Sequence, residues 1–161
     1  MVESSRRQAT DRPYPWQCPV CLKPEVVPTT LPYTARVKHD GAIHEVPVAG
    51  LEVPRCRSCG ELVFSQRVDD QINAALRAQL HLLTPEQIQS GRRKFGLDQQ
   101  GLAEQLGVAP ETVSGWESGA LIPTRAMDNL LRLFFALPEV RAVLAGKGRN
   151  PNLGVVIPTP V

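Results

Sequence analysis

The chain has 161 residues, of which 42% are hydrophobic and 21% charged, and its net charge of +2 suits an ordinary protein with one or two small domains. This composition excludes long membrane spans, because the best apolar stretch, Leu130 to Leu137, contains Arg132 and ends at Pro138. The N-terminus has basic residues but no apolar run after them, so we expect no signal peptide and a cytoplasmic location.

Fifteen prolines mark a change of composition along the chain. They crowd the first 55 residues and the last dozen, whereas residues 65–121 contain only Pro85 and Pro110, both at plausible helix starts. We therefore expect a strand-rich N-terminal half that holds the cysteines, followed by a helical half.

The only four cysteines form two pairs, Cys18-x2-Cys21 and Cys56-x2-Cys59. Each spacing lets a tight turn point two sulfurs at one ion, and two such turns form the tetrahedral thiolate site that is typical of structural zinc. Gly60 suits the second turn because glycine tolerates positive φ. The alternatives are two disulfides, four unrelated thiols or redox-active iron in the same cage, and nothing suggests a secreted protein. We expect one structural Zn²⁺ per chain, which would supply much of the folding free energy of this small domain.

The 34 residues between the cysteine pairs are enough for a small sheet. Alternating side chains predict one strand over Leu31–Lys38 and a returning strand over Ala42–Val48, with Asp40-Gly41 as the hairpin turn. His39 and His44 lie on this hairpin, and we do not expect them to be ligands because four thiolates already fill a tetrahedral site.

A helical period begins near Ser65 and predicts a linking helix over residues 65–83, packed partly on the sheet. Thr84-Pro85-Glu86-Gln87 predicts the start of the next helix, with a cap, a proline at the first position and a capping box. Gly96 should end this helix.

Residues 99–118 fit a helix-turn-helix. Counted from Gln99, position five is the small Ala103, where two helices must nearly touch, and position nine is Gly107, where the turn needs positive φ. Positions four, eight, ten, fifteen and eighteen are of buried type: Leu102, Leu106, Val108, Val113 and Trp116. An ordinary helical hairpin is the alternative, which seven agreeing positions disfavour.

Two further helices should follow, one capped by Thr124 and a short one from Pro138 to Gly146. Apolar residues cover more than one face of the first: Met127, Leu130, Leu131, Phe134 and Phe135. A core is the simplest role for them, but the excess apolar surface favours a homodimer interface in this C-terminal domain.

Leu102-Ala103, Gly107-Val108, Thr112-Val113-Ser114 and Trp116-Glu117-Ser118-Gly119 resemble the Cro/XRE class of helix-turn-helix domains. Together with the two cysteine pairs, they make residues 16 to 140 similar to an MqsA-family antitoxin with a YgiT-type zinc finger. The resemblance implies a type II toxin-antitoxin system. In it the zinc domain masks a cognate toxin, usually an mRNA interferase, while the C-terminal domain dimerises and represses the operon.

The resemblance also implies contacts with operator DNA. Gln99 would touch a phosphate, and Glu111, Thr112 and Gly115 occupy positions from which such domains reach base edges. The expected DNA-binding residues are Gln99, Pro110, Glu111, Thr112, Ser114, Gly115 and Arg125. An Arg92–Glu117 ion pair is implied as well.

Two features of this chain depart from a strong DNA-binding domain. Gly115 stands where many relatives carry Arg or another long donor. Glu111 can only accept, so it either suits cytosine N4 or repels phosphate. Residues 84–146 also contain six Lys or Arg against seven Asp or Glu, a weak electrostatic footprint.

The sequence therefore predicts an α+β protein of two domains. We expect a disordered N-terminus over 1–13, a four-cysteine zinc-bound β-ribbon over 14–64, the linking helix over 65–83, an all-α five-helix domain over 84–146 and a mobile tail over 147–161. No enzyme is expected, because the histidines are scattered and a four-thiolate zinc has no open position for water. The alternatives are a zinc-containing transcription regulator without a toxin and a rubredoxin-like electron carrier fused to a regulator.

Overall fold

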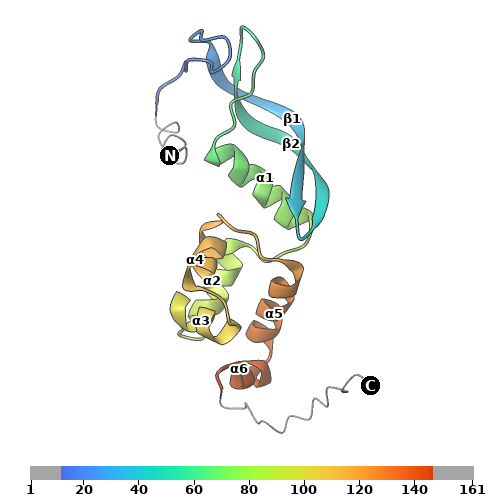
Figure 1. Cartoon of the computed structure of the whole chain (residues 1–161), viewed down its shortest axis with the longest axis vertical. Helices are drawn as coiled ribbons and strands as arrows, with labels where there is room; N and C mark the ends of the chain where they lie inside the picture. The colour runs from blue at the N-terminus through green and yellow to red at the C-terminus, as the bar shows by residue number, and fades with distance from the viewer. Residues whose placement is uncertain (1–11, 147–161) are drawn as a thin grey trace, which may run out of the picture. The chain divides into compact units, whose positions relative to one another are not determined.

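The structure is a computed structural model that describes residues 12–146. The chain divides between Leu82 and Leu83 into two compact units, each with its own core, which are drawn together in Figure 1. A two-stranded sheet with a cysteine cluster and six helices within the described residues confirm the predicted α+β class. The expected disordered N-terminus and mobile tail lie outside the described residues, apart from Arg12 and Pro13.

The first unit is built on a long antiparallel hairpin of β1 (Val26–His39) and β2 (Ala42–Cys56). The predicted Asp40-Gly41 turn is confirmed, with φ angles of 53° and 80° that match the twist of a two-residue hairpin loop.

Both strands are longer than the sequence pattern predicted, and the added segments contain prolines such as Pro28 and Pro54. In a two-stranded sheet each strand has one free edge, so a proline can direct its nitrogen outward without breaking the ladder. Pro32 lies at a register shift between Leu31 and Tyr33, where it has no partner residue on β2.

The linking helix α1 (Gln66–Gln79) packs on β2, as predicted, and buries Val68, Ile72 and Leu76. The side-chain amide of Gln71 accepts from the backbone N–H of Glu52 and donates to its carbonyl, both at 2.9 Å. Figure 1 shows α1 running along the hairpin. The helix ends at Gln79, before residue 83, and the chain then turns through a positive φ at His81.

The second unit contains the five predicted helices: α2 (Pro85–Lys94), α3 (Gln99–Leu106), α4 (Pro110–Ser118), α5 (Arg125–Ala136) and α6 (Pro138–Leu144). The capping box at Thr84 is confirmed, since Thr84 and Gln87 each bond the other's backbone N–H. The core consists of Ile88, Leu102, Ala103, Leu106, Val113, Trp116, Leu131 and Phe134. No helix within residues 12–146 has the length and apolarity needed to cross a bilayer.

A fully buried carboxylate, Asp128 on α5, anchors the start of this unit. It accepts from the backbone N–H of Leu83 at 2.7 Å and from Arg132 Nε at 2.7 Å. The partners compensate the charge for its loss of water. Asp128 is polar, but its side chain therefore lies inside this unit and stabilises it.

Candidate metal centre and nucleic-acid interface

The hairpin brings the two cysteine pairs together. Cys56 ends β2 opposite Val26, and Val26 also pairs with Trp16, just before Cys18. The four sulfurs lie within 4.8 Å of one another. Two of the separations, Cys18 to Cys59 and Cys21 to Cys56, are 3.6 Å and connect one pair to the other.

These separations fit a tetrahedral metal site. Four sulfurs at about 2.3 Å from a central zinc would be about 3.8 Å apart. A disulfide requires about 2.0 Å, and all four cysteines are free thiols. The cluster can therefore hold one metal ion, and the structure does not favour the disulfide alternative.

The backbone of both turns supports the sulfurs. Val20 N–H points at Cys18 Sγ at 3.4 Å, and Gly60 has the predicted positive φ of 81°. The equivalent position after Cys21 is Leu22, which has a φ of 61°. A leucine in this left-handed conformation costs about 1 kcal/mol or more, so the first turn is held at the expense of local strain.

The thiols differ in acidity. The Cys21 N–H is the main group that lowers the pKa of Cys18, and the Cys59 N–H lowers the pKa of Cys56 to about 7. The Glu61 amide acts to lower the pKa of Cys59, but burial and the three neighbouring thiols outweigh it and raise that pKa to about 12. Four thiols this close cannot all ionise without a cation to balance them, as expected of a metal-binding donor set.

The hairpin histidines lie away from this centre. His39 and His44 flank the turn, whereas Cys56 lies at the opposite end of the strand register. They are therefore not ligands of the four-cysteine site, as the sequence predicted.

In the second unit, α3 and α4 are joined by the short turn that the sequence predicts. Ala103 is fully buried, and Gly107 ends α3 with a φ of 76°. The N–H groups of Gly107 and Val108 both donate to the Ala103 carbonyl, at 2.9 and 3.0 Å. The buried positions Leu102, Leu106, Val113 and Trp116 are likewise confirmed.

The predicted Arg92–Glu117 ion pair is confirmed. Arg92 donates through Nε and Nη2 to the two carboxylate oxygens at 2.6 and 3.0 Å, and Gln99 adds a third bond to Glu117 at 3.0 Å. The side chains of Arg92 and Glu117 are only 10% and 2% exposed. Hydrogen bonding to Glu117 raises the pKa of Arg92; burial acts to raise the pKa of Glu117, but its donors outweigh burial and lower it.

The expected DNA-binding residues occupy different environments. Pro110, Glu111 and Ser114 are exposed and Thr112 is half-buried. The side-chain amide of Gln99 donates a hydrogen bond to Glu117, as described above. Arg125 is 47% exposed and lies 3.6 Å from Asp128, so part of its charge is neutralised within the unit.

Gly115 lies beneath a residue that the sequence analysis did not single out. A Cβ on Gly115 would lie 2.6 Å from Cδ1 and 2.7 Å from Cγ of Leu121, so no larger residue fits there without moving Leu121. The Leu121 N–H donates to the Gly115 carbonyl at 2.9 Å, yet Leu121 as a residue is 47% exposed. No local sequence signal links two positions on either side of the α4 terminus.

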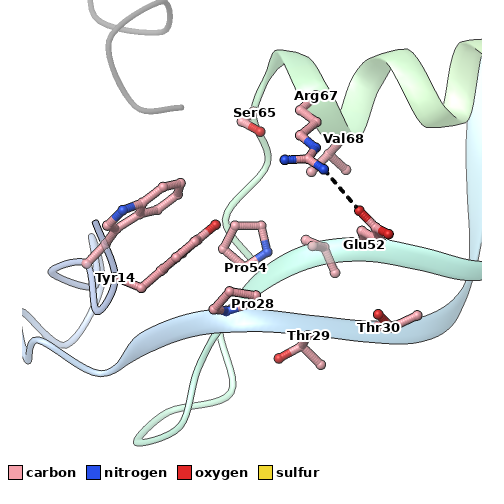
Figure 2. Close-up of a pocket in the computed structure, with 11 residues that line it drawn as sticks. Tyr14, Pro28, Thr29, Thr30, Glu52, Pro54, Ser65, Arg67 and Val68 are labelled. Atoms are coloured by element: carbon pink, nitrogen blue, oxygen red, sulfur yellow. Dashed lines mark hydrogen bonds and ion pairs between the residues drawn. The ribbon is translucent and has the colours of Figure 1, made fainter. Parts of the chain in front are cut away.

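The first unit also contains a pocket of about 400 Å³. Figure 2 shows Tyr14, Pro28 and Pro54 on one side and the Arg67–Glu52 ion pair, at 3.3 Å, on the other. Tyr14 stacks on Trp16 with ring centroids 4.3 Å apart. No local sequence pattern indicates this pocket, because its walls come from four separate segments: the one before β1, the two strands and the start of α1.

A family model described as "Antitoxin component of bacterial toxin-antitoxin system, MqsA" matches residues 16–144. Among curated proteins, "Antitoxin MqsA" of Escherichia coli (strain K12) is 29% identical over 131 residues, which cover 77% of this chain and 95% of that protein. The family match begins at Trp16 and ends at the last residue of α6, so it includes both units.

Proposed function

The chain belongs to the MqsA antitoxin family, and on this premise we propose that it inactivates a small toxin through its N-terminal unit and represses its own operon through its helical unit. The observation that carries the proposal is the extent of the family match, which spans the cysteine cluster and all five helices of the second unit. The toxin is proposed to be an mRNA interferase, and the antitoxin itself to have no enzymatic role.

We propose Zn²⁺ as the metal, one ion per chain, bound by Cys18, Cys21, Cys56 and Cys59. Support comes from the sulfur separations, which suit zinc–thiolate bonds. Four protein ligands would leave no position for water, so the ion would stabilise the fold and take no part in chemistry. Free thiols and operator DNA both suit a cytoplasmic protein.

For DNA binding we propose that α3 and α4 act as a helix-turn-helix with α4 in the major groove. Glu111 and Ser114 are exposed on α4, and the proposed contacts also include Gln99, Pro110, Thr112, Gly115 and Arg125. Burial of Arg92 with Glu117 withdraws one cation from a unit whose acidic residues already outnumber its basic ones. A dimer that spans two half-sites would compensate by doubling the phosphate contacts.

We propose that this dimer forms through the helical unit. The apolar residues of α5, which the sequence suggested were too many for a core, pack within the unit. Leu131 and Phe134 are buried, and Met127, Leu130 and Phe135 pack against the core. Exposed apolar residues nearby are Leu133 on α5, Leu137 between the two helices and Val143 on α6. A second copy is the occupant proposed for them, because an isologous contact would cover the same residues on both chains.

For the toxin, we propose the pocket of the first unit as a contact surface. Tyr, Trp and Arg are the residues most often found at the energetic centre of protein interfaces, and Tyr14, Trp16 and Arg67 line this pocket. The Arg67–Glu52 pair is exposed on both sides, so it contributes little to folding and is accessible to a partner.

Co-expression tests the two roles separately. The reading frame beside this gene would be expressed alone, and then with the full chain or with its Tyr14→Ala variant. We expect growth arrest when the neighbouring frame is expressed alone and restored growth when the full chain is present. With the Tyr14→Ala variant we expect weaker rescue. A reporter fused to the upstream region would measure repression in the same cells. Repression without rescue would identify a transcription regulator without a toxin, and rescue without repression would refute the proposed DNA role.

A further inference from the structure

We propose that Leu121 is a specificity-determining residue that reads a thymine methyl group in the operator, in place of the long side chain that Gly115 lacks. This inference rests on the proposed DNA-binding role of α3 and α4. It assigns a function to a residue outside the two helices.

A Cβ at position 115 would lie within 2.6–3.2 Å of three side-chain atoms of Leu121, all closer than ordinary van der Waals contact. Glycine at this position and leucine at 121 are therefore complementary. The space in which related domains place a long side chain from position 115 is therefore filled by Leu121, from the segment after α4.

Gly115 lies one helical turn after Glu111, so both belong to the same side of α4. Glu111 is exposed, and Leu121, which packs over Gly115, is 47% exposed. The hydrogen bond from the Leu121 N–H to the Gly115 carbonyl, at 2.9 Å, holds the segment against the helix. A half-exposed leucine therefore extends the face that carries Glu111.

Leucine can neither donate nor accept a hydrogen bond, so it can recognise only an apolar feature of a base edge. In the major groove of unmodified DNA that feature is the C5-methyl group of thymine. Glu111, as an acceptor, suits the N4 amine of cytosine. Positions 111 and 115 are about 6 Å apart along the helix axis, which corresponds to about two base pairs.

Replacement of thymine by deoxyuridine tests this assignment, because it removes the methyl group and keeps the pairing. Full-length zinc-loaded protein would first select duplexes from a randomised pool. Each thymine of the selected half-site would then be replaced singly, and affinities would be measured at one salt concentration. For the unaltered chain we expect one position per half-site at which uracil weakens binding about fourfold, the effect of one apolar carbon left unburied.

The variants complete the test. Leu121→Ala should bind thymine and uracil duplexes equally, and Leu121→Met should keep part of the discrimination. Gly115→Ala should lose it because its Cβ displaces Leu121, with circular dichroism used to verify folding. Ile43→Ala removes an exposed apolar side chain from the other unit and serves as the matched control.

Three results would overturn the proposal. If uracil weakens Leu121→Ala as much as the unaltered chain, another group reads the methyl. If no thymine matters, no methyl is read. If no duplex is bound at all, the DNA-binding role fails together with this inference, whereas the first two results leave that role intact.

Discussion

Glu117 connects three segments of the helical unit through one buried carboxylate. It follows the predicted reading positions of α4 and accepts from Arg92 on α2 and from Gln99 at the start of α3. Arg92 also donates to the Leu97 carbonyl at 2.7 Å, so the pair fixes the loop between α2 and α3. This arrangement places both expected DNA-contacting helices on a common support.

Removal of one partner should therefore be costly. Arg92→Ala leaves Glu117 in a nearly dry site without its cation, and we expect the free energy of unfolding to fall by about 3 kcal/mol. Arg93→Ala, which alters the adjacent exposed arginine, should change it by less than about 0.5 kcal/mol. Urea denaturation of both variants measures the difference, and equal midpoints would show that the pair contributes nothing to stability.

The same carboxylate predicts a pH dependence. The pKa of Glu117 is lower in the folded protein than its ordinary value of 4.5. The folded state then binds fewer protons than the unfolded state, so the contribution of Glu117 is complete above about pH 5 and declines as the pH falls through the folded pKa. Thermal unfolding between pH 3 and 7 should show less acid destabilisation for Glu117→Gln than for the unaltered chain. An unchanged slope would contradict this linkage.

At the scale of elements, α4 and the start of α3 should contribute differently to DNA binding. Thr112→Ala is expected to reduce discrimination between operator and unrelated duplexes by roughly 1 kcal/mol, because it alters a position proposed to read bases. Gln99→Ala should weaken binding to all sequences alike, since it removes a proposed phosphate contact. Competition titrations measure both effects, with Gln100→Ala, whose side chain bonds Glu104, as control. If neither variant changes binding, α3 and α4 do not form the DNA-binding surface.

The cysteine cluster takes the place of an apolar core at one end of the hairpin. Only Cys18, Val26 and Cys56 are buried there, with Trp16, Cys21 and Val63 packed around them. So few apolar contacts cannot hold two turns together alone, and a bound ion would supply the missing free energy.

Loss of one ligand should consequently unfold the first unit. In full-length protein, Cys56→Ser should abolish stoichiometric zinc in native mass spectrometry and collapse the NMR amide signals of residues 16–79 into the narrow random-coil range. Signals from the helical unit should stay in place, because its core uses residues of that unit alone. Ser58→Ala lies in the same turn without supplying a ligand and should keep the ion. A folded, metal-free first unit in the Cys56→Ser variant would show that the metal is dispensable.

At the scale of the whole molecule, the two units have separate cores, and within the described residues the cysteine cluster that can hold a metal ion lies in the first unit. This separation would let the first unit respond to the proposed toxin while the second keeps the fold proposed to bind DNA. Family membership over both units is consistent with this division of roles.

The sequence by itself determined the features that depend on a few neighbouring residues. The cysteine spacings, the capping box at Thr84, the turn at Asp40-Gly41 and the left-handed Gly107 were all predicted, because each follows from local geometry. The ion pair between Arg92 and Glu117 came from the family resemblance, since 25 residues separate its members.

Only the tertiary structure decided features whose cause is a distant partner. The strands extend past the alternating pattern because a two-stranded sheet leaves room for proline at its edges. Asp128 is buried because its carboxylate meets the N–H of Leu83, 45 residues earlier. Leu121 covers Gly115 because the chain folds back over α4 after the helix ends. Neither burial nor close packing of this kind has a local sequence signal, because each depends on where another segment lies in three dimensions.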